Sequence, residues 1–165
     1  MAQTRDIGLK ALRDQGFDLH GGEEVQDVFQ TRFLSFMQRS LVIGILTTLG
    51  FGLVPGLSIS FAMQVGLALM IVVVWFFVFD EWQEWRDRGA DVWILTNHRL
   101  ILINPREDVS ASWWNLSDIH SVRRVFWWAL LVRARDGRAT LMRYVGPLSD
   151  VRARILAAKE GAQNV

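Results

Sequence analysis

Hydrophobic and polar residues are distributed very unevenly along this chain of 165 residues. No Lys, Arg, His, Asp or Glu occurs between Leu41 and Phe79, so all the acidic and basic residues lie outside that window. A helix needs about 20 mostly apolar residues to cross a bilayer core. The segment 59–79 has that length, with only Ser60 and Gln64 as interior polar residues. This pattern predicts a membrane-spanning helix over 59–79.

The apolar run that precedes it, 41–54, is clean but short. It reaches spanning length only as a helix over 33–54, which then contains Arg39 between Gln38 and Ser40. The side chain of Arg39 would have to extend to the lipid headgroups. Pro55-Gly56 favours a tight turn between the two helices. Together these segments predict a two-helix transmembrane hairpin over 33–79.

Charges next to the hairpin predict its orientation. Basic residues lie before the first helix and after the second, whereas the connector has none, so both termini are expected in the cytoplasm. Amphipathic side chains expected at the membrane interface are Trp75, Trp82, Trp85 and Arg39. Two other arrangements stay open. The hairpin could be re-entrant, or it could be a buried core, although so small a chain has little else to cover it.

The segment 80–165 is predicted to form a small antiparallel β domain. Within 92–103, two β-rich runs flank Asn97-His98, and a two-residue turn there makes both faces of the resulting hairpin apolar. Other elements should therefore cover both faces. Apolar residues at helical spacing then predict a C-terminal helix over about 148–160, which would cover the sheet.

A second hairpin is predicted over 125–145, because Asp136-Gly137 is a strong two-residue turn signal. In that register, Arg135 faces Arg138 across the turn. One face is mainly core and contains Trp128, Leu130, Val132, Ala134, Ala139, Leu141, Arg143 and Val145. The opposite face contains Trp127, Leu131, Arg133, Arg135, Arg138, Met142 and Tyr144.

This opposite face supplies the candidate contact residues. Arg133, Arg135 and Arg138 form a basic tip that anionic lipid headgroups or an acidic partner would stabilise, since facing like charges repel. Trp127, beside Tyr144, is a candidate anchor for a protein partner. No metal-ligand spacing, nucleophile motif or phosphate loop occurs, so we expect neither catalysis nor a cofactor. The net charge of +1 gives no overall field that would attract nucleic acid.

Several short motifs resemble the bacterial pleckstrin-homology-like domain family. The "T-N-x-R-L" hairpin motif is matched by Thr96, Asn97, Arg99 and Leu100, and the "L-x-x-I-x-x-V" segment by Leu116, Ile119 and Val122. The terminal-helix pattern is matched by Leu148, Val151 and Ile155. A "G-E-x-V" opening occurs at Gly22 to Val25, before the predicted hairpin of helices. The resemblance implies a partly open β barrel or sandwich closed by a C-terminal helix, with a binding or scaffolding role.

The resulting expectation is an α+β membrane protein of the bacterial inner membrane, multi-pass, with both termini cytoplasmic. Residues 1–32 would be a cytoplasmic segment, 33–79 the hairpin, and 80–165 the pleckstrin-homology-like domain. The expected role is a non-enzymatic accessory subunit or assembly factor of a larger membrane-protein complex, such as a photosynthetic or respiratory one. The alternative is a binding module that senses anionic membrane lipids through the basic tip.

Overall fold

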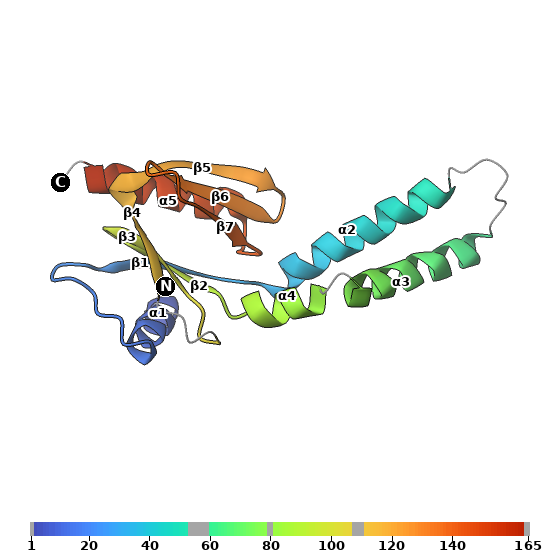
Figure 1. The fold of residues 1–165 in the computed structure, drawn as a ribbon, viewed down its shortest axis with the longest axis horizontal. Helices are drawn as coiled ribbons and strands as arrows, with labels where there is room; N and C mark the ends of the chain where they lie inside the picture. The colour runs from blue at the N-terminus through green and yellow to red at the C-terminus, as the bar shows by residue number, and fades with distance from the viewer. Residues whose placement is uncertain (1, 53–59, 79–80, 107–110, 164–165) are drawn as a thin grey trace.

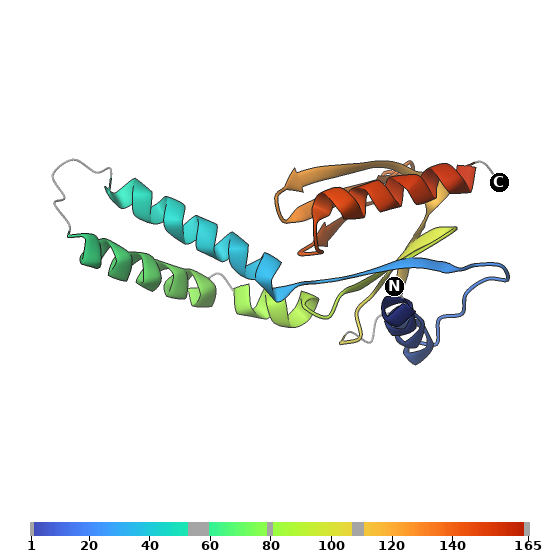
Figure 2. The same cartoon turned by 180° about the vertical axis from the view of Figure 1, so that it is seen from behind.

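A computed structural model describes residues 2–52, 60–78, 81–106 and 111–163. A β body lies at one end of the molecule, and two long helices project from it side by side (Figures 1 and 2). In chain order the elements are α1 (Ala2–Asp14), β1 (Val25–Gln30), α2 (Phe33–Gly52), α3 (Phe61–Val78), α4 (Glu81–Arg88), β2 (Val92–Thr96), β3 (Arg99–Ile103), β4 (Ser112–Asn115), the 3-10 turn η1 (Leu116–Asp118), β5 (Ile119–Phe126), β6 (Ala129–Ala134), β7 (Ala139–Arg143) and α5 (Leu148–Gln163).

Two antiparallel sheets build the β body. The first has the strand order β1-β2-β3-β4 and the second the order β5-β6-β7. The main core lies between the sheets and α5, and it contains Trp93 and Leu100 from the first sheet, Leu130 and Val132 from the second, and Ile155 from the helix. The C-terminal helix therefore completes the core, since its apolar face is buried against both sheets.

The outer face of the first sheet is also covered. Ile94 and Ile101, which point away from the main core, pack with Leu12 of α1 and Val28 of β1 in a second buried cluster. A Cβ atom on Gly8 of α1 would lie 2.5 Å from Cγ2 of Val28, so glycine permits this close approach of helix and strand. The prediction that both faces of the β2–β3 hairpin are covered is confirmed, with the pairing Leu95–Leu100 expected from a two-residue turn.

The N-terminal segment is part of the β body. β1 pairs with β2 along its length, and α1 packs on the same sheet. The sequence pattern instead placed the domain entirely after the hairpin. The structure corrects this order: α2 and α3 are inserted between β1 and the remaining strands of one sheet. A single strand of six residues, separated from its partners by the hairpin, leaves little periodic signal in the sequence.

The transmembrane prediction is wrong for the described residues. None of the helices in the described ranges combines the length and the apolar character that a membrane crossing requires. α3 has 18 described residues, and α2, which has 20, includes Arg39. The multi-pass inner-membrane location and the assignment of both termini to the cytoplasm depended on the two spans, so they lose their basis. The predicted turn at Pro55-Gly56 lies outside the described residues.

The register of the β6–β7 hairpin also differs from the prediction. Leu130 pairs with Met142 and Val132 with Thr140, one residue away from the expected pairing. The connection is a three-residue loop, Arg135 to Gly137, in which Gly137 has a positive φ of 87°. A shift of one residue turns every side chain of one strand to the other face of the sheet. β7 therefore contributes Met142, and not Leu141, to the core.

Candidate interaction surface

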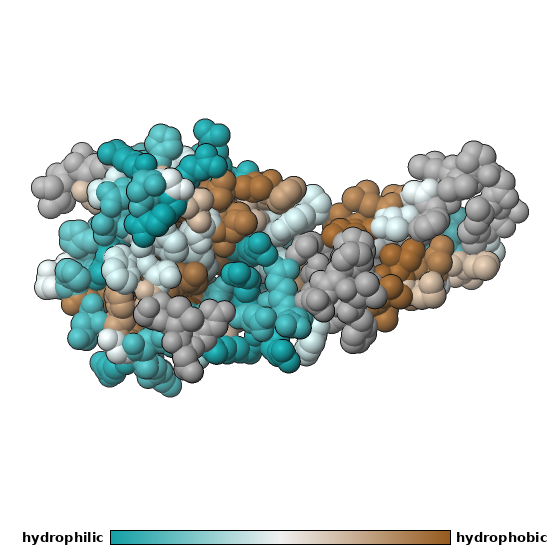
Figure 3. Space-filling view, viewed as in Figure 1, coloured by the Kyte–Doolittle hydropathy of each residue, from teal (hydrophilic) through white to brown (hydrophobic). Residues whose placement is uncertain are grey.

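The projecting helices carry most of the exposed large hydrophobic side chains (Figure 3). We define the apolar hairpin surface as the exposed side chains of α2 and α3, namely Phe33, Leu34, Leu41, Ile45, Leu46, Leu49, Met63, Val65, Leu69, Met70, Val73 and Val74. Leu34 is 71% exposed and Leu69 is 63% exposed. Monomeric proteins rarely expose a contiguous apolar area of this kind unless it binds something.

An aromatic cluster joins this hairpin to the β body. Phe36 of α2 is fully buried, and its ring centroid lies 5.2 Å from that of Trp85 in α4 and 5.3 Å from that of Tyr144. Phe33 lies 5.1 Å from Trp85 in an edge-on arrangement. Such ring pairs add about 0.5–1.5 kcal/mol each beyond their buried area. The base of the hairpin is thus held by α4 and the second sheet.

The residues predicted to lie at a membrane interface have other surroundings. Trp85 is half-buried in the aromatic cluster, whereas Trp82 on the same helix is 52% exposed. The side chains of Trp75 and Arg39 lie outside the part of the structure that is described. α4 turns Trp85 towards Phe33 and Phe36, so only the surroundings of Trp85 differ from the expectation.

Tyr144 is not an exposed contact residue, contrary to the prediction. It is 1% exposed, because the register shift turns it into the body, and its hydroxyl lies 3.5 Å from Oε1 of Glu84. Arg143 donates a hydrogen bond to the same carboxylate oxygen. Tyr144 adopts a positive φ of 57°, and its carbonyl oxygen accepts a hydrogen bond of 2.8 Å from the backbone N–H of Arg32. It links the second sheet to the start of α2.

Trp127 does lie at the surface, in the turn between β5 and β6. The pair Phe126–Ala129 closes a two-residue turn made of Trp127 and Trp128. The rings of Phe126 and Trp128 stack at 4.7 Å with an angle of 7°, and Trp127 meets Trp128 edge-on at 4.5 Å. Trp127 is 45% exposed and Phe126 52% exposed. This aromatic turn lies at the end of the second sheet that faces α2 (Figure 1).

The basic tip has a different charge arrangement from the predicted one. Arg133, Arg135 and Arg138 are all exposed, but the register places Arg138 opposite Ala134, whose N–H donates to the Arg138 carbonyl at 2.8 Å. Arg138 also forms an ion pair with Asp136 at 2.5 Å. The backbone N–H and the side chain of Arg138 donate to Asp136 and lower the pKa of its carboxyl group. Arg135 and Arg138 therefore do not face each other across the turn, and the repulsion expected between them is not found.

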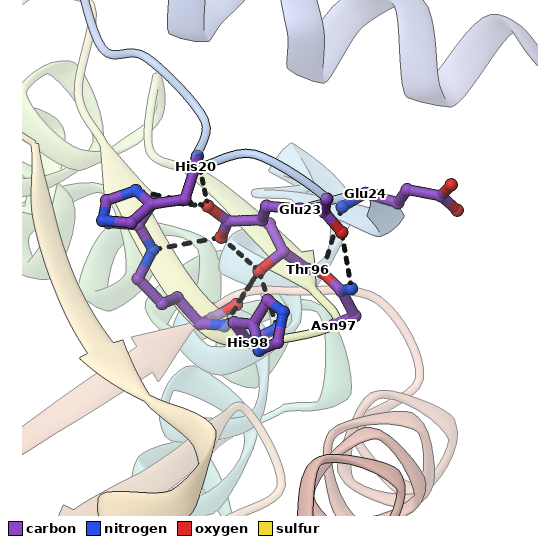
Figure 4. A network of polar contacts seen from close by, with 8 residues as sticks. His20, Glu23, Glu24, Thr96, Asn97 and His98 are labelled. Atoms are coloured by element: carbon purple, nitrogen blue, oxygen red, sulfur yellow. Dashed lines mark hydrogen bonds and ion pairs between the residues drawn. The ribbon is translucent and has the colours of Figure 1, made fainter. Parts of the chain in front are cut away.

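A buried polar network lies at the end of the body farthest from the hairpin (Figures 1 and 4). The side chain of Glu23 is fully buried, and its carboxylate accepts hydrogen bonds from Nε and Nη2 of Arg99, the first at 3.0 Å. The hydroxyl of Thr96 donates to Glu23 at 2.7 Å, and the backbone N–H of His20 donates at 3.0 Å. Burial raises the pKa of Glu23, but the hydrogen bonds and the charge of Arg99 outweigh it and lower the pKa to about 2.

Asn97 ties the same two segments together through the backbone. Its side-chain oxygen accepts from the N–H of Glu24 at 3.0 Å, and its side-chain amide donates to the carbonyl of Gly22 at 3.1 Å. The "G-E-x-V" and "T-N-x-R-L" motifs, which lie more than 70 residues apart, are thus two halves of one network (Figure 4). This pairing was missed at the sequence level, because nothing in either motif indicates its partner.

The polar network has the properties of a structural element. Arg99 is 7% exposed and is paired with Glu23, and its Cζ lies over the ring of Phe17, 5.1 Å from the ring centroid. No group of three or more His, Asp or Glu side chains in the described ranges is arranged to hold a metal ion. His98, next to the network in sequence, is exposed.

Comparisons with protein-family models, with characterised proteins and with solved structures give no match to this chain.

Proposed function

We propose that this chain is a non-enzymatic accessory or assembly subunit of a larger membrane-protein complex. The apolar hairpin surface would be its main contact with the partner. The single observation that carries the proposal is the concentration of exposed aliphatic side chains on α2 and α3, including Leu46, Leu49 and Leu69, each at least 60% exposed. Burial of such surface contributes about 25 cal/mol per Å² of apolar area.

The partner surface should be apolar and helical. No acidic or basic residue lies between Leu41 and Phe79, so an interface there has no charge to offer to a polar partner. A Cβ atom added to Gly50 or Gly66 would have no heavy atom within 4 Å. Small residues on an apolar helix allow the backbone of a neighbouring helix to approach closely. Apolar helices of a membrane protein have this chemistry.

The β body would position the hairpin and add a second contact. Its four-stranded and three-stranded sheets, closed by α5, support the proposed resemblance to the pleckstrin-homology-like family. The aromatic cluster around Phe36 would transmit the orientation of the body to the hairpin. Trp127, exposed in the turn that faces α2, would contact the same partner, since aromatic residues are frequent anchors in interfaces.

Affinity purification of the full chain in mild detergent, followed by mass spectrometry, tests this proposal. We expect a defined protein partner with the wild-type chain and at least a tenfold smaller yield of it with Leu69→Glu, because an unpaired carboxylate is costly to bury in an apolar interface. Ile7→Glu is the matched control. It places the same charge at another exposed apolar position, on α1, 42% exposed, and should leave the yield unchanged.

Three outcomes would contradict the proposal. The chain could purify as a lone monomer, it could carry only lipid and detergent, or the partner could stay bound to the Leu69→Glu variant. Trp127→Ala gives an independent check. It should weaken the complex without changing the denaturant midpoint of the chain, whereas loss of folding would show that Trp127 is a core residue.

A further inference from the structure

A cavity of about 360 Å³ lies where the hairpin meets the β body. Its walls come from three places: the start of α2, the aromatic turn between β5 and β6, and the first residues of α5. The lining includes two arginines, Arg32 and Arg124, and no acidic residue among those described. We infer that this cavity binds a phosphate ester, a function separate from the docking of the apolar hairpin surface.

Arg32 is positioned at the centre of these elements. Its backbone N–H donates to Tyr144, and its carbonyl accepts from the N–H groups of Ser35 and Phe36 in the first turn of α2. Its guanidinium lies close to Gly146, since a Cβ atom at that glycine would be 3.8 Å from Cζ and Nε of Arg32. This contact places the guanidinium beside a residue that lines the cavity. The side chain of Arg32 is exposed, so its guanidinium is accessible to a ligand that enters from solvent.

Arg124 approaches from the opposite wall, on β5. It is exposed, and its Nε donates to the backbone carbonyl of Phe126 at 3.2 Å. Within the described ranges neither Arg32 nor Arg124 has an ion-pair partner. Guanidinium groups match the geometry of phosphate oxygens through paired hydrogen bonds. Two unpaired arginines in one cavity therefore favour a ligand with at least one negative charge and several acceptor oxygens.

The start of α5 adds donors to the same cavity. Leu148 and Ser149 are the first residues of this 16-residue helix, and both line the cavity. The N–H groups of Asp150 and Val151 donate to the carbonyl of Pro147, so the N–H groups that an anion could meet here are those of Leu148 and Ser149. Side chains of Ser35, Gln38 and Trp127 complete the wall with polar and aromatic contacts.

Two acidic residues line a neighbouring cavity. Asp150 and Asp27 line that second cavity together with Arg154, which forms an ion pair with Asp27. Arg154, which offsets the charge of Asp27, does not line the phosphate cavity. Arg32 lines both cavities. Arg124 lines the phosphate cavity and not the neighbouring one.

Isothermal titration calorimetry of the full chain in mild detergent tests the inference. One arm uses glycerol 3-phosphate in solution, and the other uses phosphatidic acid in detergent micelles with phosphatidylcholine as its neutral reference. Arg124→Gln and Arg32→Gln should each weaken binding at least tenfold, and Arg32→Lys should weaken it less. Arg133→Gln, which removes the same charge from the exposed basic tip, should change the Kd less than twofold.

The two arms identify the source of the phosphate. Binding of both probes would show that the phosphate itself is recognised, and binding of phosphatidic acid alone would show recognition of a lipid headgroup. Saturable binding of neither probe would overturn the inference, as would equal losses with Arg133→Gln and Arg124→Gln. If Arg32→Gln does not fold, as judged by circular dichroism, the exposed Arg124 still gives the decisive comparison.

Discussion

The guanidinium of Arg99 donates two hydrogen bonds to the carboxylate of Glu23, which lies 76 positions earlier in the chain. Both side chains are buried at the turn between β2 and β3. The hydroxyl of Thr96 accepts a hydrogen bond of 2.8 Å from the backbone N–H of Arg99. The turn that contains the ion pair thus also orients the backbone of Arg99. This pair fixes the segment before β1 against the sheet that β1 joins.

Removal of the Glu23 carboxylate should destabilise the fold. We expect Glu23→Gln to lower the free energy of unfolding by about 3 kcal/mol, because breaking a buried pair leaves Arg99 as an uncompensated charge. Urea denaturation followed by circular dichroism measures this difference. Glu24→Gln is the matched control, since Glu24 is exposed and contributes its backbone N–H and carbonyl to the contact with Asn97. A similar loss in both variants would contradict the assigned role of the Glu23 carboxylate.

The same carboxylate should make stability depend on pH in the acidic range. The pKa of Glu23 is lowered from 4.5 to about 2, so the unfolded chain binds the proton more readily than the folded one. Its contribution is therefore complete above pH 4.5 and is lost as the pH falls towards 2. That pKa difference corresponds to about 3 kcal/mol.

The measurement is the free energy of unfolding of the wild-type chain and of Glu23→Gln between pH 7 and pH 2.5. The difference between the two curves isolates Glu23 from the other carboxylates. It should shrink as the pH falls below 4.5. A difference that stays constant over this range would show that the carboxylate gains no stabilisation from its charge.

The register of the β6–β7 hairpin makes neighbouring positions respond oppositely. Met142 is fully buried, and Met142→Ala should cost about 2–5 kcal/mol, because it leaves a cavity in the core. Leu141 is 36% exposed, and Leu141→Ala should cost less than about 1 kcal/mol. Chemical denaturation of both variants distinguishes this register from the two-residue turn. The reverse order of the two costs would restore the pairing expected from Asp136-Gly137.

The fold was predictable where local pattern and chain neighbourhood agree. The β2–β3 hairpin is an example, since Leu95 pairs with Leu100 across a turn of two residues and alternation along each strand fixes its faces. The register predicted for the β6–β7 hairpin was wrong for a related reason. Gly137 suits both a two-residue and a three-residue loop, and the choice depends on whether Met142 or Leu141 fits the core.

The candidate contact residues were only partly predictable. Trp127 was expected at the surface and is found there, although in a turn and not in a strand. Tyr144 was expected beside it and is buried, because its position follows the β7 register. Arg32 and Arg124 carried no signal as a pair, since 92 positions separate them (124 minus 32) and only the packing of α2 against the second sheet places them on one cavity.

The sequence by itself determined the charge-free segment, the two apolar faces of the β2–β3 hairpin and the amphipathic C-terminal helix, because these are properties of neighbouring residues. The tertiary structure decided that β1 and α1 belong to the body, that Glu23 meets Arg99, and which face of β7 is buried. It also corrected the interpretation of the charge-free segment, for which no described helix meets the requirements of a membrane crossing. Contacts between distant segments depend on how whole elements fill a common core, and no local periodicity encodes that fit.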